Sequence, residues 1–219
     1  MRILINIILI TISLSLFGQP KPIKPIVLSE NDPEAEKILN SFNSKYQKLK
    51  SYTFDFAVNI SDLEAKTKET YNGTYKNKGV KFFLKLKEMD VFTNGKMYYS
   101  VNYKSKEVQI QDYNQNLKKD LPFEQINNYK KKYKYRVKEV LDKNRKVIEL
   151  VPLNKNNPIF KIDVVIQTQS NQLKSIKVYE KSGYRILYTI SKLKENEKLS
   201  DTEFEFNSKN YSDFEILDL

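Results

Sequence analysis

The sequence predicts a mainly β protein built on one curved antiparallel sheet of about 11 strands. Three observations support this prediction. Apolar residues recur at every second position in many short segments, turn residues separate those segments, and only two segments have helical signals. Strands joined by such short connections pair antiparallel. A sheet of that many strands tends to curl into a barrel or half-barrel.

The first residues have the pattern of a secretory signal peptide. Arg2 supplies positive charge, residues 3–16 are almost wholly apolar, and Gly18 offers a small residue for cleavage. The apolar run is shorter than the roughly 20 residues of a spanning helix, which disfavours the alternative of a retained membrane anchor. The expected order is a signal peptide over 1–18, an extended Pro/Lys leader over 19–32 and one domain over 33–219.

Composition limits the chemistry that the chain can perform. It contains no cysteine and no histidine, which removes the thiol nucleophile and the usual general base and metal ligand. Its five glycines form no phosphate-binding loop. We therefore expect no enzyme and no cofactor. The net charge of +11 suits nucleic acid, anionic lipid headgroups or acidic proteins, and export favours the last two; a solvated basic surface is the alternative.

Asp32 and Pro33 predict the start of a helix that runs to about Lys48. Aspartate can cap the helix, and proline is tolerated in the first turn. The residues behind them recur at spacings of three and four and form one apolar stripe. The members of this stripe are Ala35, Leu39, Phe42, Tyr46 and Leu49.

Strand patterns begin directly after this helix. Apolar residues alternate through Tyr52, Phe54, Phe56, Val58 and Ile60, which predicts a strand with one aromatic face. Further alternation covers Phe82, Leu84 and Leu86, and Met97, Tyr99, Val101 and Tyr103 after an Asn94-Gly95 hairpin signal, with a short strand at Val108 and Ile110. A short helix over 121–126 and a basic, tyrosine-bearing stretch over 129–138 follow. The remaining strands are expected at 147–153, 159–166, 173–180, 184–193, 204–206 and 214–217.

The concave side of such a sheet must be filled. A curled sheet of about 11 strands encloses more volume than its own side chains occupy. The N-terminal helix could fill this space completely and form a solid core, or a ligand could occupy part of it. Periodicity alone supports the two alternatives equally.

Six segments follow one another in an order that is typical of one protein family: Leu49-Lys50-Ser51-Tyr52-Thr53-Phe54-Asp55-Phe56, Gly73-Thr74-Tyr75, Phe92-Thr93-Asn94-Gly95-Lys96-Met97-Tyr98-Tyr99, Val147-Ile148-Glu149-Leu150-Val151-Pro152, Leu173-Lys174-Ser175-Ile176 and Asp201-Thr202-Glu203-Phe204-Glu205-Phe206. In this order they resemble the LolA family of periplasmic carriers of outer-membrane lipoproteins. The signal peptide and the missing lipid-attachment cysteine agree with this resemblance, which covers nearly the whole mature chain.

The resemblance implies an unclosed half-barrel covered by the N-terminal helix and a short internal lid helix, with a hydrophobic cavity between them. It also implies a periplasmic monomer that takes lipoprotein acyl chains from an inner-membrane exporter to an outer-membrane acceptor or an anionic membrane surface, without nucleic acid. The implied lid residues are Leu121, Phe123 and Ile126. The implied cavity residues are Leu39, Phe42, Tyr46, Tyr52, Phe54, Phe56, Val58, Tyr75, Phe82, Leu84, Leu86, Met97, Tyr99 and Val101.

The chain departs from the family pattern at three points. Family members commonly carry an Arg-Pro pair after the glycine-containing strand, and that arginine is associated with lid closure. Here Lys78-Gly79-Val80 stands nearby, so Lys78 is the expected lid-control cation, although lysine cannot make the forked contacts of arginine. Tryptophans common on the family's strands are absent, and residues 208–213 lack the usual proline.

Three other functions remain as alternatives. One is a lipid-sensing or interaction domain with the same fold, which a partner domain or a membrane anchor would favour. An enzyme acting on lipid or glycan would have to depend on carboxylates, of which no convincing pair is visible. A structural envelope protein would have a filled core.

Overall fold

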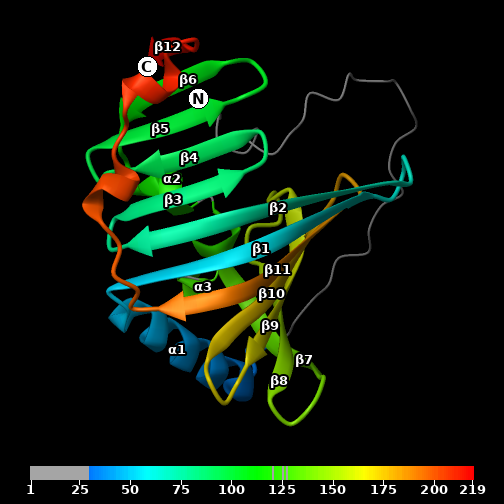
Figure 1. Cartoon of the computed structure of the whole chain (residues 1–219). Coiled ribbons are helices and arrows are strands. Elements are labelled where there is room, and N and C mark those ends of the chain that lie inside the picture. Colours follow the sequence, from blue (N-terminus) through cyan, green and yellow to red (C-terminus); the bar gives the residue numbers. More distant parts are fainter. Residues whose placement is uncertain (1–29, 120, 125, 127) are drawn as a thin grey trace.

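The computed structural model describes residues 30–119, 121–124, 126 and 128–219, so the predicted signal peptide and most of the predicted leader lie outside the described residues. The described residues form one 12-stranded sheet, and a long N-terminal helix packs against its concave face (Figure 1). The elements are α1 (Pro33–Lys48), β1 (Ser51–Asp62), β2 (Thr67–Lys78), β3 (Lys81–Leu86), β4 (Met89–Thr93), β5 (Met97–Asn102), β6 (Glu107–Asp112), α2 (Gln115–Lys119), η2 (Pro122–Glu124), α3 (Tyr129–Lys132), β7 (Tyr133–Val140), β8 (Arg145–Pro152), β9 (Ile159–Gln167), β10 (Gln172–Glu180), β11 (Tyr184–Glu195), η3 (Asp201–Phe204), η4 (Ser208–Tyr211) and β12 (Glu215–Asp218).

The strand order explains how the sheet becomes a half-barrel. It runs β12-β6-β5-β4-β3-β2-β1-β11-β10-β9-β8-β7, with all pairs antiparallel except the parallel pair of β12 and β6. The chain therefore builds one half outward from β1 to β6, crosses over, and builds the other half from β7 back to β11 beside β1. The sheet is unclosed, with β7 and β12 at its edges, which confirms the predicted fold class.

Helix α1 begins where the sequence predicts, and its cap also fixes the sheet edge. Oδ1 of Asp32 accepts hydrogen bonds from the backbone N–H groups of Glu34 (2.8 Å) and Ala35 (3.3 Å). Oδ2 accepts from the backbone N–H of Val137 in β7, at 2.9 Å. The bond from Val137 is the main cause that lowers the pKa of the Asp32 carboxyl. One carboxylate thus joins the helix start to the edge strand.

Replacing Asp32 with alanine is expected to lower the free energy of unfolding by about 1–2 kcal/mol, because both the helix cap and the bond to β7 are lost. Because folding lowers the pKa of Asp32, its stabilisation is complete above the unfolded pKa near 3.8 and is lost as pH falls through the lower folded pKa. Urea unfolding of the wild type and Asp32→Ala at pH 7 and in acid measures both effects. If the two proteins differed in free energy of unfolding by the same amount in strong acid as at pH 7, the result would contradict this role of the carboxylate.

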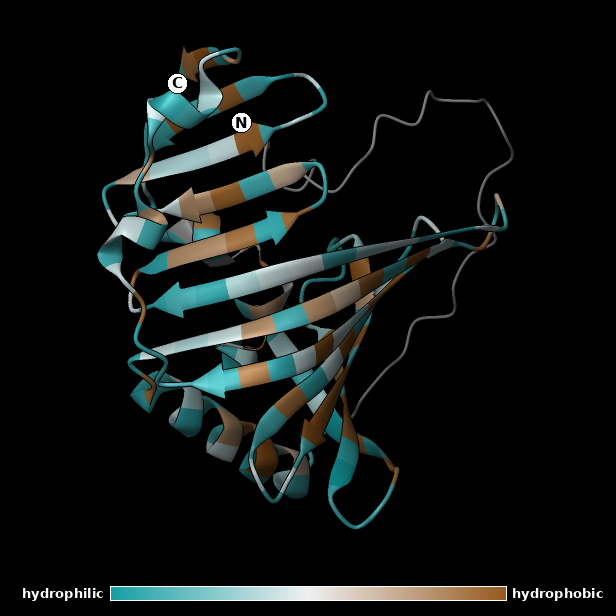
Figure 2. Cartoon of the chain, in the orientation of Figure 1, coloured by the Kyte–Doolittle hydropathy of each residue, from teal (hydrophilic) through white to brown (hydrophobic). Residues whose placement is uncertain are grey.

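The two faces of the sheet carry two separate hydrophobic cores. Along several strands hydrophobic and hydrophilic residues alternate, as Figure 2 shows by colour. The first core lies on the concave face, where β1–β3 and β7–β11 pack against α1. The second core lies on the opposite face of β4–β6, where Phe92, Tyr99, Val101 and Val108 pack against Phe206, Tyr211 and Phe214 from the C-terminal part of the chain.

Residues 197–214, which we call the strap, run along the convex side of β1–β6 (Figure 1). The predicted strand over 204–206 is wrong: residues 201–204 form η3, because Ser200 and Glu203 make a reciprocal capping box that starts a helical turn. Ion pairs join the strap to the sheet, among them Lys76 with Glu203 at 2.6 Å. Stacked rings of Tyr99, Phe206 and Tyr211 continue this contact.

The structure adds detail to two further segments. Within the segment 121–126, where the sequence predicts a short helix, residues 122–124 form the 3-10 helix η2, which follows the separate helix α2. The basic stretch over 129–138 contains α3 and most of the edge strand β7, in which Tyr133 and Tyr135 belong to the first core while Lys134 between them does not. Among the described residues, no helix is long and apolar enough to cross a membrane.

Candidate functional site

The concave face brings together most of the residues that the sequence proposes for a cavity. They belong to α1, β1, β2 and β3 and form one continuous aromatic and aliphatic surface. Buried in this surface are Leu39, Phe42, Tyr52, Phe54, Phe56, Val58, Tyr75, Phe82 and Leu84, with Tyr46 and Leu86 partly buried against them. Rings of Tyr52, Phe54 and Tyr75 are neighbours, with centroids 5.2–6.3 Å apart.

Met97, Tyr99 and Val101 do not belong to this surface, so the prediction that they line the cavity is wrong. They lie on the opposite face of β5, in or against the second core, and Tyr98 is the β5 residue that faces the first core. The alternation pattern of β5 could not show this, because the strap buries its outer face as well. A strand that is apolar on both faces does not reveal which face points inward.

Sequence reasoning left out the other half of the concave face. Strands β7–β11 contribute a mainly aliphatic surface opposite the aromatic one, and their alternation in the sequence would have found it. Its fully buried members are Ile148, Leu150, Ile162, Val164, Ile166 and Ile176. The concave face therefore has an aromatic half and an aliphatic half.

The centre of the aromatic half is covered by Phe123, one of the three predicted lid residues. Its ring lies 4.7 Å from Phe54, 5.3 Å from Phe56, 5.5 Å from Tyr75 and 5.8 Å from Tyr188, centroid to centroid. Only 8% of Phe123 is exposed. A single ring from a three-residue turn therefore occupies the middle of the sheet's apolar surface.

The two other predicted lid residues also lie against the concave core. Ile126 is fully buried within it, and Leu121 is partly buried against it. Within this segment the backbone N–H of Glu124 donates to the carbonyl of Leu121 at 2.9 Å. Burial of Phe123 and Ile126 also holds the segment against the first core.

Glu124 fastens the same turn by polar contacts. The phenol of Tyr75 donates a hydrogen bond to Oε1 of Glu124 at 3.4 Å, and the ammonium of Lys118 lies 3.5 Å from the same oxygen. Burial raises the pKa of Tyr75 and of Tyr52 well above their usual range, and the charge of Glu124 adds to both shifts. The two phenols therefore keep their protons and can act as donors to this carboxylate.

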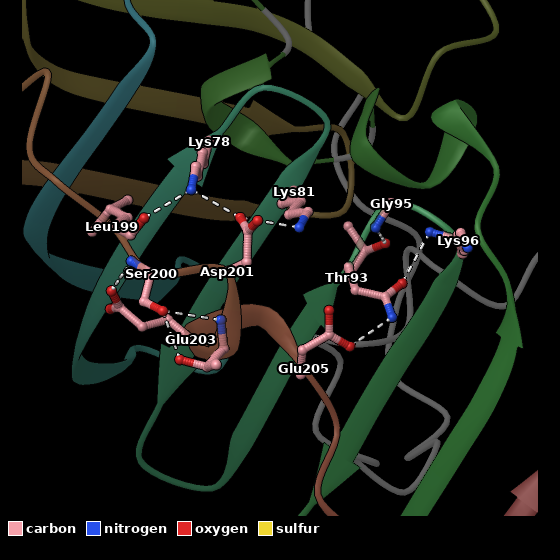
Figure 3. A network of polar contacts seen from close by, with 12 residues as sticks. Lys78, Lys81, Thr93, Gly95, Lys96, Leu199, Ser200, Asp201, Glu203 and Glu205 are labelled. Carbon is pink, nitrogen blue, oxygen red and sulfur yellow. Dashed lines mark hydrogen bonds and ion pairs between the residues drawn. The ribbon is translucent and has the colours of Figure 1, made fainter.

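Lys78 contacts the strap and not the turn that carries Phe123. Its ammonium donates to the carbonyl of Leu199 and pairs with Asp201, both at 2.8 Å, and Lys81 shares that carboxylate at 3.1 Å (Figure 3). Contrary to the expectation from sequence, the cation that contacts this turn is Lys118. Lys78 is the last residue of β2, next to the strap, so its side chain contacts the strap on the convex side.

Two surface hollows of the described residues are lined mostly by charged and polar residues. One lies between the turn that joins β7 to β8 and strands β9–β11, and the other lies between β1, β2 and the strap. The concave apolar surface is instead closed by α1 and Phe123.

The comparisons with known proteins agree with this architecture. The family model described as "Outer membrane lipoprotein carrier protein LolA" matches residues 47–207, which is more than half of the chain. A comparison of this chain with curated protein sequences found no match.

Solved structures are similar to this chain at low sequence identity. An uncharacterized conserved protein from Thermus thermophilus is similar with a TM-score of 0.53 and 10% identity, over 85% of this chain and 99% of that one. A putative outer membrane lipoprotein-sorting protein domain from Vibrio parahaemolyticus has a TM-score of 0.46 and 12% identity, over 81% and 99%. The Mycobacterium tuberculosis lipoprotein LppX has 0.45 and 12%, over 78% and 99%.

The family model matches most of the sheet, from the end of α1 through β11 to the strap. It includes β1, the turn with Phe123 and the aliphatic strands, which together form the concave site. The chain therefore belongs to the LolA family of outer membrane lipoprotein carrier proteins.

Proposed function

We propose that this protein is a periplasmic carrier that binds the acyl chains of lipoproteins on its concave face and takes them from the inner to the outer membrane. The observation that supports this proposal is the apolar concave surface, whose aromatic centre is covered by one ring from a short turn. In this role it acts as a monomer and not as an enzyme, and it meets an inner-membrane exporter and an outer-membrane acceptor. The family match favours the same role.

Burial of acyl chains supplies enough free energy for transport through water. Each methylene removed from water contributes about 0.8 kcal/mol, so ten contribute about 8 kcal/mol before ordering costs. Displacing Phe123 from four aromatic neighbours opposes part of this gain. The resulting moderate affinity suits a carrier that must release its cargo, and direction then depends on the different affinities of exporter, carrier and acceptor.

One observation favours a second function. Because α1 and Phe123 close the concave face, the same fold could serve as an interaction or lipid-sensing domain in the cell envelope, without carriage. In that case the first core would remain closed, and partners would bind elsewhere. The two functions differ in whether acyl chains enter the protein.

Lipid analysis of the purified protein separates these functions. The whole chain, expressed with export and purified without detergent, should carry acyl lipid or lipoprotein that mass spectrometry identifies. After delipidation it should accept an acylated lipopeptide and give it up to acceptor membranes. A protein that never holds acyl chains, under either condition, would contradict the carrier role and leave the interaction domain.

A further inference from the structure

The convex side of the sheet has two halves that differ in how their positive charges are neutralised. On β1–β6 the acidic strap supplies the counter-charges: Asp201 pairs with Lys78 and Lys81, and Asp213 pairs with Lys106 at 2.7 Å. Within the described part of the chain, no such segment covers the outer side of β7–β11 (Figure 1). Most cations of this half are therefore exposed or partly exposed.

Six of the cations on this outer side form what we call the basic face: Lys134, Arg136, Lys138, Lys161, Lys177 and Arg185. The acidic residues among them are Glu149, Asp163 and, at the exposed end of β7, Glu139. Positive charges therefore outnumber negative charges six to three.

Two buried carboxylates hold half of the basic face in place. Glu149, whose side chain is 2% exposed, lies 2.7 Å from Nη2 of Arg136 and 3.6 Å from Nζ of Lys161. Asp163, 8% exposed, accepts hydrogen bonds from Lys138 and from the phenol of Tyr179, each at 2.8 Å. These carboxylates lie below the cations, so they fix the cations without covering them.

The other three cations have no carboxylate partner among the described residues. Lys177 and Arg185 lie over the ring of Tyr179, at 5.2 and 5.3 Å from its centroid, and Lys161 lies over the same ring at 3.9 Å. Lys134 projects from β7 on the same side as Arg136. Unpaired cations around an aromatic ring suit an anionic surface with an apolar layer beneath it.

We propose that the basic face binds the anionic headgroups of a membrane surface. It extends over five adjacent strands, and at about 4.8 Å per strand this is a width of about 19 Å. A surface of phosphate groups can meet exposed cations on several of these strands together, whereas one extended acidic peptide covers only one or two strands. This inference does not depend on whether the concave face carries acyl chains.

Vesicle sedimentation with paired variants tests this proposal. Residues 30–219 contain both cores, so a chain that starts at Gln19 keeps every described contact and lacks the apolar run of the predicted signal peptide. It should sediment with phosphatidylcholine vesicles that contain phosphatidylglycerol, and not with phosphatidylcholine alone. The double variant Lys134→Gln/Lys177→Gln should bind the anionic vesicles about 30-fold more weakly.

A matched control separates the basic face from net charge. Lys87→Gln/Lys104→Gln removes the same charge from exposed turns of the β1–β6 half and should bind nearly as well as the wild type. Thermal unfolding checks that both variants fold. Equal losses in the two variants, or wild-type binding to phosphatidylcholine alone, would overturn the proposal. Binding to polyglutamate without binding to vesicles would overturn it in favour of an acidic protein partner.

Discussion

Replacing Gly73 with alanine is expected to lower the free energy of unfolding by about 3 kcal/mol, at the upper end of overpacking costs. A Cβ at this position would lie 2.5 Å from the backbone carbonyl oxygen of Lys85 and 2.5 Å from Cζ of Phe56. The carbonyl belongs to the neighbouring strand β3 and cannot move away without breaking the ladder. Phe56 lies directly across from Gly73 in the register, so its ring needs the space that glycine leaves.

Urea unfolding measures this effect, and Asn72→Ala is the matched control. Asn72 is the exposed neighbour of Gly73 on the opposite side of β2, so its truncation should change stability by less than about 1 kcal/mol. Equal unfolding midpoints for Gly73→Ala and the wild type would contradict this prediction. They would mean that the Phe56 ring and strand β3 move aside without a cost in stability.

Replacing Phe123 with alanine is expected to strengthen acyl binding by on the order of tenfold. The same change is expected to lower the stability of the ligand-free protein. In the wild type an acyl chain must first displace the ring from Phe54, Phe56, Tyr75 and Tyr188. The variant has no ring to displace, so the binding-competent state is more populated. Isothermal titration with an acylated lipopeptide, beside thermal unfolding of the free protein, measures both effects.

Phe92→Ala is the control for this prediction. Phe92 is 2% exposed and stacks on Phe83 and Tyr99 in the second core, so its truncation should cost comparable stability without a gain in acyl affinity. Weaker acyl binding by Phe123→Ala than by the wild type would contradict the prediction. It would mean that the Phe123 ring contacts the bound acyl chain and does not occupy the position of that chain in the free protein.

Local sequence patterns predicted the parts of this fold that one element determines. Asp32 and Pro33 mark the start of α1, and the alternation from Tyr52 to Ile60 marks an aromatic strand with one buried face; the structure confirms both. The Asn94-Gly95 turn likewise joins β4 to β5 as predicted.

Contacts that depend on distant segments could not be predicted in this way. The face of β5 that points inward depends on the strap, about a hundred residues later in the chain, which makes both faces apolar. The partners of Lys78 depend on the same strap. Tyr133 and Tyr135 alternate with basic residues, and only their position at the sheet edge beside α1 shows that they belong to the core.

The central claim is that acyl chains enter beneath Phe123, and fluorescence quenching tests it most directly. The chain contains no tryptophan, so Phe123→Trp and Tyr99→Trp each introduce a single reporter, one in the first core and one in the second. On addition of a lipopeptide with brominated acyl chains, the account predicts a change in emission from Phe123→Trp and none from Tyr99→Trp. Unchanged emission from Phe123→Trp during saturable binding, or equal quenching in both variants, would contradict it.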